Sequence, residues 1–248
     1  MVRIFLAAAA ISALLPLGAP NAAEPLTRSD VEAIVRDYLI ANPEVLEEAF
    51  AALQQRRIEE AEEERAAALA TMREDLEGSP YGAVLGNPEG DVTLVEFFDY
   101  NCGYCKRAHE DLDRLIAGDP NLRVVLREFP VLGEASMRAA QVSIAVNAVA
   151  PEAYDEFHRR LLATEGRADD AAALTLIDAL GLPREEIEAA MTSDAVRESV
   201  EESYALARAL QIEGTPSYVI GDAVEQGAVG HDALKARINI ARCGTPSC

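Results

Sequence analysis

Hydrophobic and polar positions in the first third of the chain follow a helical spacing. From Leu26 to Glu77 apolar residues recur at intervals of three and four, among Ala, Glu, Leu and Arg, which predicts helices. N-cap candidates at 27–30 precede the first helix, and the second restarts at Asn42-Pro43, with Asn42 as its cap. The apolar stripes are Val31, Ile34, Val35, Tyr38 and Leu39; Leu46, Phe50 and Leu53; and Leu69, Met72 and Leu76.

Neither helix can bury its apolar stripe by itself. In addition, the stripe slips within the charged stretch 54–65, where charge on nearly every side suits a projecting helix. We therefore expect residues 24–77 to be a helical stalk through which copies of the chain associate; the alternative is that these helices fold back on the next domain. Gly- and Pro-containing segments at 78–80 and 86–88 predict a linker after the stalk.

The pattern changes to short apolar runs after residue 90. Four runs have the length and composition of strands: 92–98, 122–128, 217–220 and 223–229. Helices are expected at 103–116, over the interrupted stretch 134–210 and at 232–241. Without a helical insertion at about 133–210, this is the order of a thioredoxin fold, so residues 78–248 are expected to form one α/β domain.

The first residues have the pattern of an export signal. Arg3 gives a short positive region, and residues 4–17 are apolar but too short to favour a transmembrane helix. We expect a signal peptide at 1–23, cleaved after Ala23; an uncleaved anchor is the alternative, because Asn21 stands where a small residue is usual. The net charge of −21 argues against nucleic-acid binding, which requires a positive patch.

The chemistry of the chain centres on Cys102-Gly103-Tyr104-Cys105, between the first of these strands and its helix. At a helix start, unpaired backbone N–H groups and the helix dipole favour the Cys102 thiolate, which is the nucleophile of disulfide exchange. Cys105 lies one turn later, close enough to form a disulfide with Cys102, and Gly103 and Tyr104 shape the loop. A CxxC motif beside a βαβ pattern favours redox catalysis over a structural disulfide or a metal site.

Two further segments are candidates for the same site. Glu96 lies within an apolar strand, where a carboxylate is costly unless it has a role, so we expect a buried acid that moves protons for Cys105; an edge position facing solvent is the alternative. Pro216, after Thr215, either marks the start of a strand or is a cis-proline beside the sulfurs. His109, His158 and His231 are interpreted as ordinary positions, His109 on a polar helix surface.

The remaining cysteines, Cys243 and Cys248, flank a turn-rich spacer. In an oxidising compartment a local structural disulfide is the first expectation, ahead of free or intermolecular thiols. Together with the motif cysteines they would also complete a zinc site, although the two pairs do not both lie on short loops. We expect no metal and no cofactor apart from the redox-active disulfide Cys102–Cys105.

The motifs resemble the DsbA-like thioredoxin-fold proteins in three separated places: 95–105, 128–133 and 214–216. The resemblance implies that Cys102 attacks, that Cys105 resolves, that Glu96 is the buried acid and that Thr215-Pro216 is a cis-proline loop lining the substrate groove. Gly-Tyr replaces the Pro-His of strongly oxidising members and is more like the disulfide isomerases. The segment 26–77 resembles the N-terminal region of the Com1-like and suppressor-of-copper-sensitivity C-like branch, some members of which oligomerise through it.

These features predict a periplasmic thiol:disulfide oxidoreductase with isomerase or reductase activity. Its expected partners are unfolded or misoxidised exported proteins, a membrane thiol reductase or oxidase that resets the active site, and further copies of the chain. A DsbA-type dithiol oxidase is the alternative within this class. A periplasmic copper or zinc binder using the cysteines, or an adaptor that acts through its stalk and does not need Cys102, are alternatives of other classes.

Overall fold

A computed structural model describes residues 25–78 and 80–248, and the expected signal peptide at 1–23 lies outside them. The chain divides into two compact units between Arg57 and Ile58. In the part of the chain that the structure describes, no helix is both long enough and apolar enough to cross a membrane.

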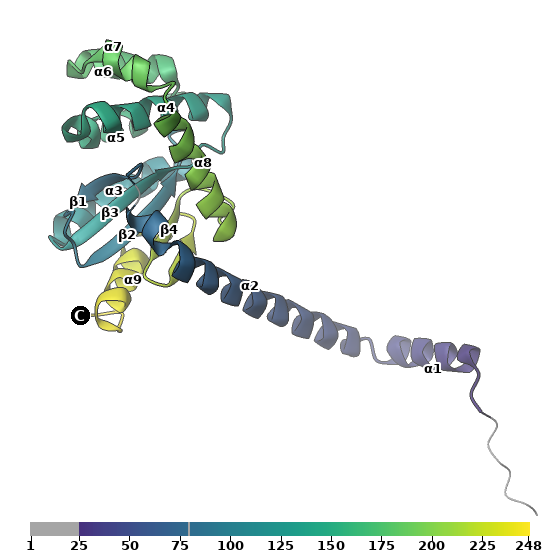
Figure 1. The fold of residues 1–248 in the computed structure, drawn as a ribbon. Coiled ribbons are helices and arrows are strands. Elements are labelled where there is room, and N and C mark those ends of the chain that lie inside the picture. Colours follow the sequence, from purple (N-terminus) through teal and green to yellow (C-terminus); the bar gives the residue numbers. More distant parts are fainter. Residues whose placement is uncertain (1–24, 79) are drawn as a thin grey trace, which may run out of the picture. The chain divides into compact units, whose positions relative to one another are not determined.

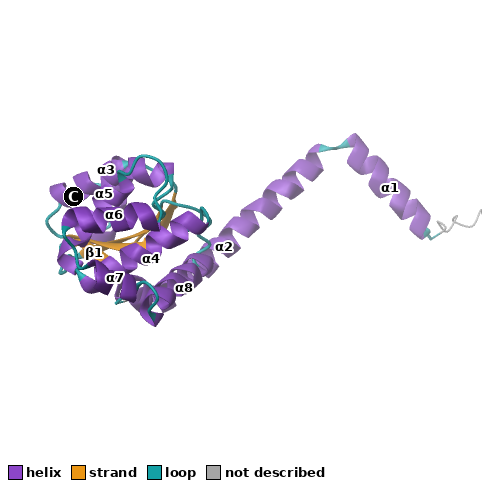
Figure 2. Ribbon diagram, turned by 90° about the horizontal axis from the view of Figure 1, so that it is seen from above, coloured by secondary structure: helices purple, strands orange, loops and turns teal. Residues whose placement is uncertain are grey.

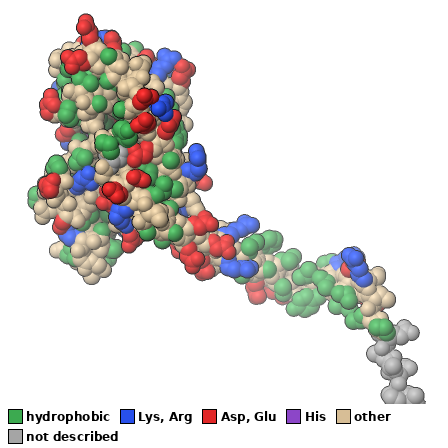
Figure 3. Space-filling model, in the orientation of Figure 1, with side chains coloured by type: hydrophobic (Ala, Val, Ile, Leu, Met, Phe, Trp, Pro, Cys, Tyr) green, Lys and Arg blue, Asp and Glu red, His purple; other side chains and the backbone are tan. Residues whose placement is uncertain are grey.

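The first unit contains α1 (Arg28–Ala41) and the first turns of α2 (Glu44–Gly78). Thr27 caps α1 through a reciprocal hydrogen-bonded pair with Asp30. The expectation that Asn42 caps the second helix is wrong, because its side-chain amide donates to the Tyr38 carbonyl and so ends α1. No residue of α1 is buried, and Figure 3 shows hydrophobic side chains gathered on the surface of this unit.

The second unit is built on a five-stranded sheet in the order β1-β3-β2-β4-β5. The strands are β1 (Ala83–Gly86), β2 (Val92–Phe98), β3 (Leu122–Glu128), β4 (Ser217–Ile220) and β5 (Ala223–Gln226). β2 and β3 are parallel, and the other neighbouring strands are antiparallel (Figure 1). The prediction that 78–88 is only a linker is wrong, since it contains β1, a strand of four residues whose short alternating pattern is hidden among Gly and Pro.

Helices cover both faces of the sheet. β2 alternates, so that Leu94 and Phe98 belong to the core on the side of α3 (Gly103–Gly118) and α9 (His231–Cys243). Val95 and Phe97 belong to the core on the other side, with the last turns of α2 and α8 (Asp194–Ala209). Glu96 has the same parity as Leu94 and Phe98, and it therefore faces α3, the helix that carries the cysteines.

The last turns of α2 are part of the second unit. Leu69 and Leu76 are buried there, and the buried guanidinium of Arg127 on β3 donates hydrogen bonds to the carbonyls of Asp75 and Leu76. These carbonyls lie at the C-terminal end of α2, where the helix itself provides no partners. The compact second unit thus begins at Ile58, within the segment assigned to the stalk from the sequence.

The helical insertion lies between β3 and β4, as expected. It comprises α4 (Glu134–Val149), a 3-10 turn (Pro151–Ala153), α5 (Tyr154–Leu162), α6 (Asp170–Leu180), α7 (Arg184–Ala190) and α8. α4 packs against α5, α6, α7 and α8 and is the centre of this layer (Figure 2). The thioredoxin order with a large helical insertion is confirmed.

Candidate functional site

Cys102 lies where β2 ends and α3 begins. It is the N-cap residue of α3, its amide donates to the Asp99 carbonyl, and the residue is 6% exposed. The neighbouring Cys105 thiol lowers the pKa of Cys102 to about 5, with further help from the Thr215 hydroxyl and the backbone N–H groups of Tyr104 and Cys105. The sulfur is therefore a thiolate at neutral pH.

Cys105 has the opposite character. It is buried in the first turn of α3, and both motif cysteines are free thiols in this structure. Its partner Cys102, its burial and the nearby Glu96 carboxyl all raise its pKa well above the usual range. One cysteine is thus ionised and the other holds its proton, which separates an attacking thiolate from a protonated resolving thiol.

Glu96 is buried, 4% exposed, in the middle of β2. Burial raises its pKa to about 8; the Tyr218 side chain, its partner on β4, partly offsets this rise. Because Glu96 also raises the pKa of Cys105, the two groups lie within electrostatic reach of each other. A carboxyl that is neutral at pH 7 and ionises near pH 8 has the pKa of a proton carrier for that thiol.

The loop before β4 closes the other side of the motif. The Thr215–Pro216 peptide bond is cis, and the Cys102 Sγ lies 3.2 Å from the Thr215 carbonyl oxygen, to which it donates a hydrogen bond when it is protonated. This brings Thr215 and Pro216, from more than a hundred residues later in the chain, to the reactive sulfur. Gly103 and Tyr104 face solvent, and the Tyr104 ring is 61% exposed, with the Arg107 guanidinium 4.5 Å from its centroid.

Asp99 is a site residue that the sequence reasoning missed. Its buried carboxylate accepts hydrogen bonds from the amides of Asn101 and Leu132 and from the Ser136 hydroxyl. These bonds join the turn before Cys102 to the beginning of the helical insertion. The only sequence signal was a charged residue directly after an apolar strand.

The interpretation of His158 as an ordinary position is wrong, because it is completely buried. Its Nδ1 lies 2.9 Å from the Tyr100 hydroxyl, and its ring packs against Phe98, Tyr154 and His109. Burial holds the pKa of His158 well below its usual range, so the ring is neutral. His109 is only 13% exposed, on the inner side of α3, rather than on a polar surface.

Cys243 and Cys248 form a disulfide at the end of α9, away from the motif, and the Cys243 sulfur contacts the Asn239 carbonyl. The local pairing expected from their spacing is present. Two of the four thiols that the zinc alternative requires are therefore bonded to each other. Among the described residues no group of three or more His, Cys, Asp or Glu side chains is arranged to hold a metal ion.

Two family models match the sequence. Residues 93–239 match the DSBA-like thioredoxin domain, and residues 28–60 match the N-terminal domain of the copper resistance protein ScsC. The first range includes Glu96, both motif cysteines and the cis-proline. The second covers α1 and the first half of α2.

Solved structures of similar proteins agree with these matches. A thioredoxin-like oxidoreductase from Silicibacter pomeroyi is 41% identical, with a TM-score of 0.66, over 68% of this chain and 97% of that one. A linker-deletion mutant of Proteus mirabilis ScsC is 30% identical, with a TM-score of 0.68, over 91% of this chain and all of the other (100%).

Curated relatives are more distant. Disulfide bond formation protein D of Bacillus subtilis is 27% identical over 66% of this chain and 77% of its own length. The chain spans about a quarter (25%) of the length of another relative, a Na⁺/H⁺ antiporter NhaA of Salinispora arenicola, at 26% identity. Together with the cysteine pair and the sheet order, the match over 93–239 shows that the chain belongs to the DsbA-like thioredoxin-domain family of thiol–disulfide oxidoreductases.

Proposed function

We propose that this protein catalyses disulfide exchange on exported proteins in the periplasm, as a disulfide isomerase or reductase. The observation that carries the proposal is the pair of cysteines with opposite pKa shifts, Cys102 ionised beside the cis-proline loop and Cys105 protonated beside Glu96. The export-signal pattern at 1–23 and the Cys243–Cys248 disulfide support an oxidising compartment.

In the proposed reaction the Cys102 thiolate attacks one sulfur of a client disulfide. The client S–S bond breaks, a mixed disulfide forms with Cys102, and the other client sulfur leaves as a thiolate. When a client thiolate attacks the mixed disulfide, Cys102 is released and the client is isomerised without net electron transfer.

When Cys105 attacks instead, it first gives its proton to water or to the ionised fraction of Glu96, which grows as pH approaches 8. The Cys102–Cys105 disulfide then forms as the bond between Cys102 and the client breaks. The client leaves with two more electrons, and its two sulfurs, released as thiolates, take up protons from Glu96 or from solvent. Glu96 acts on Cys105 as a proton carrier, which its buried position and its pKa near 8 permit. A membrane thiol reductase would return the pair to the dithiol state, and no other cofactor is required.

The low pKa of Cys102 also favours a second candidate function. A stabilised thiolate stabilises the reduced protein and makes its disulfide more oxidising, which suits a DsbA-type dithiol oxidase. That enzyme runs the same steps in reverse and is reset by a membrane oxidase.

We also propose that the first unit self-associates, which would favour the isomerase over the oxidase. Val31, Ile34, Val35 and Tyr38 of α1 are 46–56% exposed, and Phe50 of α2 is 69% exposed. Such a row of large apolar side chains is stabilised by burial against copies of itself. Joined catalytic units hold a misfolded client at several reactive sulfurs and hinder docking to a membrane oxidase.

Two ribonuclease assays separate these functions. We expect the reduced full-length protein to recover activity from scrambled ribonuclease, with Cys102→Ser inactive as the control. Rapid oxidation of reduced ribonuclease by the disulfide form, without recovery of the scrambled enzyme, would instead assign the oxidase. If the protein is an adaptor, Cys102→Ser should leave its function intact. If it is a metal carrier, the purified protein should hold stoichiometric metal after dialysis.

A further inference from the structure

A loop of the helical insertion, residues 164–168 between α5 and α6, is hydrogen-bonded to both flanks of the cysteine motif. Before the motif, the Asn101 side chain donates to the Ala168 carbonyl at 2.7 Å and accepts from the Ala168 amide at 2.9 Å. After it, the Lys106 ammonium donates to the Thr164 carbonyl at 2.7 Å. The two ends of the loop are thus fixed by the residues that adjoin Cys102 and Cys105.

Asn101 is itself held in place by the fold. Its amide group also donates to the Ser136 hydroxyl on α4 at 3.0 Å, and its backbone N–H donates to Asp99. The Asn101 side chain thus donates to and accepts from the backbone of the same residue, Ala168, as one residue of an antiparallel strand pair does with the residue opposite it.

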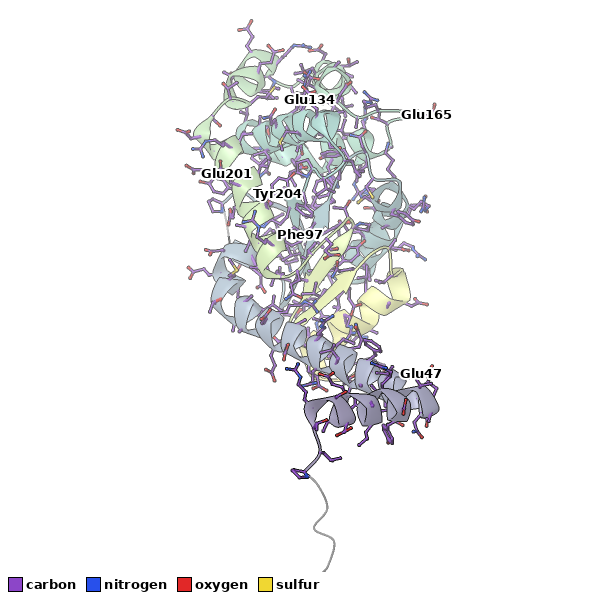
Figure 4. The ribbon with its side chains drawn as sticks, turned by 90° about the vertical axis from the view of Figure 1, so that its right-hand side faces the viewer. Glu47, Phe97, Glu134, Glu165, Glu201 and Tyr204 are labelled. Atoms are coloured by element: carbon purple, nitrogen blue, oxygen red, sulfur yellow. A yellow bond between two sulfur atoms is a disulfide. The ribbon has the colours of Figure 1, made fainter. Side chains whose placement is uncertain are left out.

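Between its fixed ends the loop turns outward. Gly166 has φ +84°, a left-handed conformation that favours glycine, and Glu165, Gly166 and Arg167 are exposed. Figure 4 shows Glu165 at the outer edge of this loop, at the same end of the unit as Glu134. Gly166 and Arg167 line a pocket of about 420 Å³ with Asn101, Leu132, Glu134 and Ala135.

The charges in this pocket select its ligand. Glu134 is already paired with Arg138. Near the motif, Lys106 is engaged by Thr164, and Arg107 lies over the Tyr104 ring. Arg167, in contrast, has no hydrogen bond or ion pair within residues 25–78 and 80–248, so its guanidinium is available to an incoming carboxylate.

We infer that residues 164–168 are a client-binding loop, in which Arg167 pairs with an acidic side chain next to the client's reactive cysteine. The inference rests on the proposed function, since only a disulfide-bearing polypeptide brings side chains to this place. The loop lies on the β3 side of the motif, with Leu132 and Glu134, whereas the cis-proline loop approaches Cys102 from the β4 side. A client chain bound by both loops would pass over the Cys102 sulfur. Asn101 and Lys106 act as positioning residues for the loop.

The test uses two synthetic peptides that differ only in having Asp or Lys beside one cysteine, which is blocked as a disulfide with 2-mercaptoethanol. Stopped-flow kinetics give the rate constant for each peptide with the reduced full-length protein, and the Asp-to-Lys ratio is compared between variants. Intrinsic differences in peptide reactivity cancel in that comparison. Arg167→Glu should lower the ratio roughly fivefold at low salt, and the effect should shrink as salt is added.

Arg208→Glu is the matched control. Arg208 is also exposed, also lacks an ion pair among the described residues, and lines no part of the pocket. The same change of net charge there should alter the ratio by less than twofold at physiological salt. The inference would be overturned if the wild type and Arg167→Glu gave equal Asp-to-Lys ratios. It would also be overturned if Arg167→Glu and Arg208→Glu changed that ratio by the same factor.

Two further measurements separate the loop from the rest of the site. Asn101→Ala should lower the Asp-to-Lys ratio about threefold, because the loop is no longer held. The rate with neutral hydroxyethyl disulfide should change by a smaller factor. An unaltered ratio would refute the positioning role of Asn101. If the wild type fails to react with hydroxyethyl disulfide, the proposed function itself is wrong. If it reacts normally but Arg167→Glu has no effect, only the client-binding loop is wrong.

Discussion

The reactivity of Cys102 arises from its immediate neighbours. The sulfur lies at the N-terminus of α3, near the N–H groups of Tyr104 and Cys105 and beside the Cys105 thiol. Each of these favours negative charge on Cys102, whereas Cys105, one turn deeper and close to Glu96, is kept protonated. The division of roles between two identical side chains is therefore a property of position.

Thiolate formation at Cys102 can be titrated directly. In the reduced protein we expect thiolate absorbance at 240 nm to appear with a midpoint near pH 5, because the pKa is lowered to about that value. Cys102→Ser should abolish this transition, and Cys105→Ser should move it upward, since the Cys105 thiol is the largest cause of the low pKa. A midpoint above pH 8 in the wild type would contradict this description of the site.

Glu96 makes the folded protein less stable as pH rises. Its folded pKa of about 8 exceeds the ordinary 4.5, so between these values the unfolded chain has released a proton that the folded protein still holds. The resulting loss of stability is absent below pH 4.5, grows as pH rises and is complete above the folded pKa near 8. Glu96→Gln should therefore raise the free energy of unfolding by about 3 kcal/mol at pH 7 and by little at pH 4.

The same variant should slow catalysis. Without a carboxylate, Cys105 loses its proton carrier, so a mixed disulfide of Cys102 should accumulate and be detectable by mass spectrometry. Glu186→Gln, at an exposed position of α7, serves as a control for the loss of one carboxylate. A stability gain that is equal at pH 4 and pH 7 would show that Glu96 does not titrate as described.

At the scale of elements, the C-terminal end of α2 belongs to the catalytic sheet. Arg127 lies in a buried strand, yet its guanidinium provides hydrogen bonds to the last carbonyls of α2 and forms an ion pair with Glu202 at 3.5 Å. Leu69 and Leu76 cover Val95 and Phe97 on the same face. The helix that leads from the first unit is thus joined to a strand next to β2.

Arg127→Met tests this joint. The variant removes the hydrogen bonds to Asp75 and Leu76 while filling a similar volume, and we expect a loss of about 2–4 kcal/mol in the free energy of unfolding. Hydrogen exchange should quicken at the end of α2 more than in α9. Unaltered exchange at residues 70–78 would show that Arg127 does not hold this helix.

The sequence predicted those parts of the site whose signals are local. Cys102, Cys105 and Glu96 lie within ten residues on one strand and one helix start, so spacing alone indicated their relation. Asp99 and Asn101 were missed because their partners, Leu132, Ser136 and Ala168, are 33 to 67 residues away and are supplied by the insertion. β1 was missed because four residues carry too little pattern to be distinguished from a linker.

At the scale of the whole molecule, the described part of the first unit, residues 25–57, has large exposed apolar side chains and no buried residue. Its surface suits the proposed self-association, and the match of residues 28–60 to the ScsC N-terminal domain supports the comparison with that branch. On this proposal an isomerase and a monomeric oxidase have the same reactive site. They differ in whether several catalytic units are linked in one assembly.

Charge placed on the apolar stripe should break the assembly. We expect the full-length protein to sediment as an oligomer and Val35→Glu to sediment as a monomer, because a carboxylate would be buried at the interface. Arg36→Glu changes charge at the adjacent exposed position and should leave the oligomer intact. A wild-type monomer at micromolar concentration would exclude assembly through this unit.

The redox equilibrium of the Cys102–Cys105 pair tests the central claim most directly. The protein with Cys243→Ser and Cys248→Ser is equilibrated in glutathione buffers, and the two motif thiols are quantified by alkylation and mass spectrometry. We predict rapid, reversible exchange with a potential of roughly −120 to −230 mV, the range of thiol–disulfide catalysts from DsbA to glutaredoxins. A disulfide that remains closed in every glutathione mixture, or that exchanges over hours, would show that the motif is structural and would contradict the account.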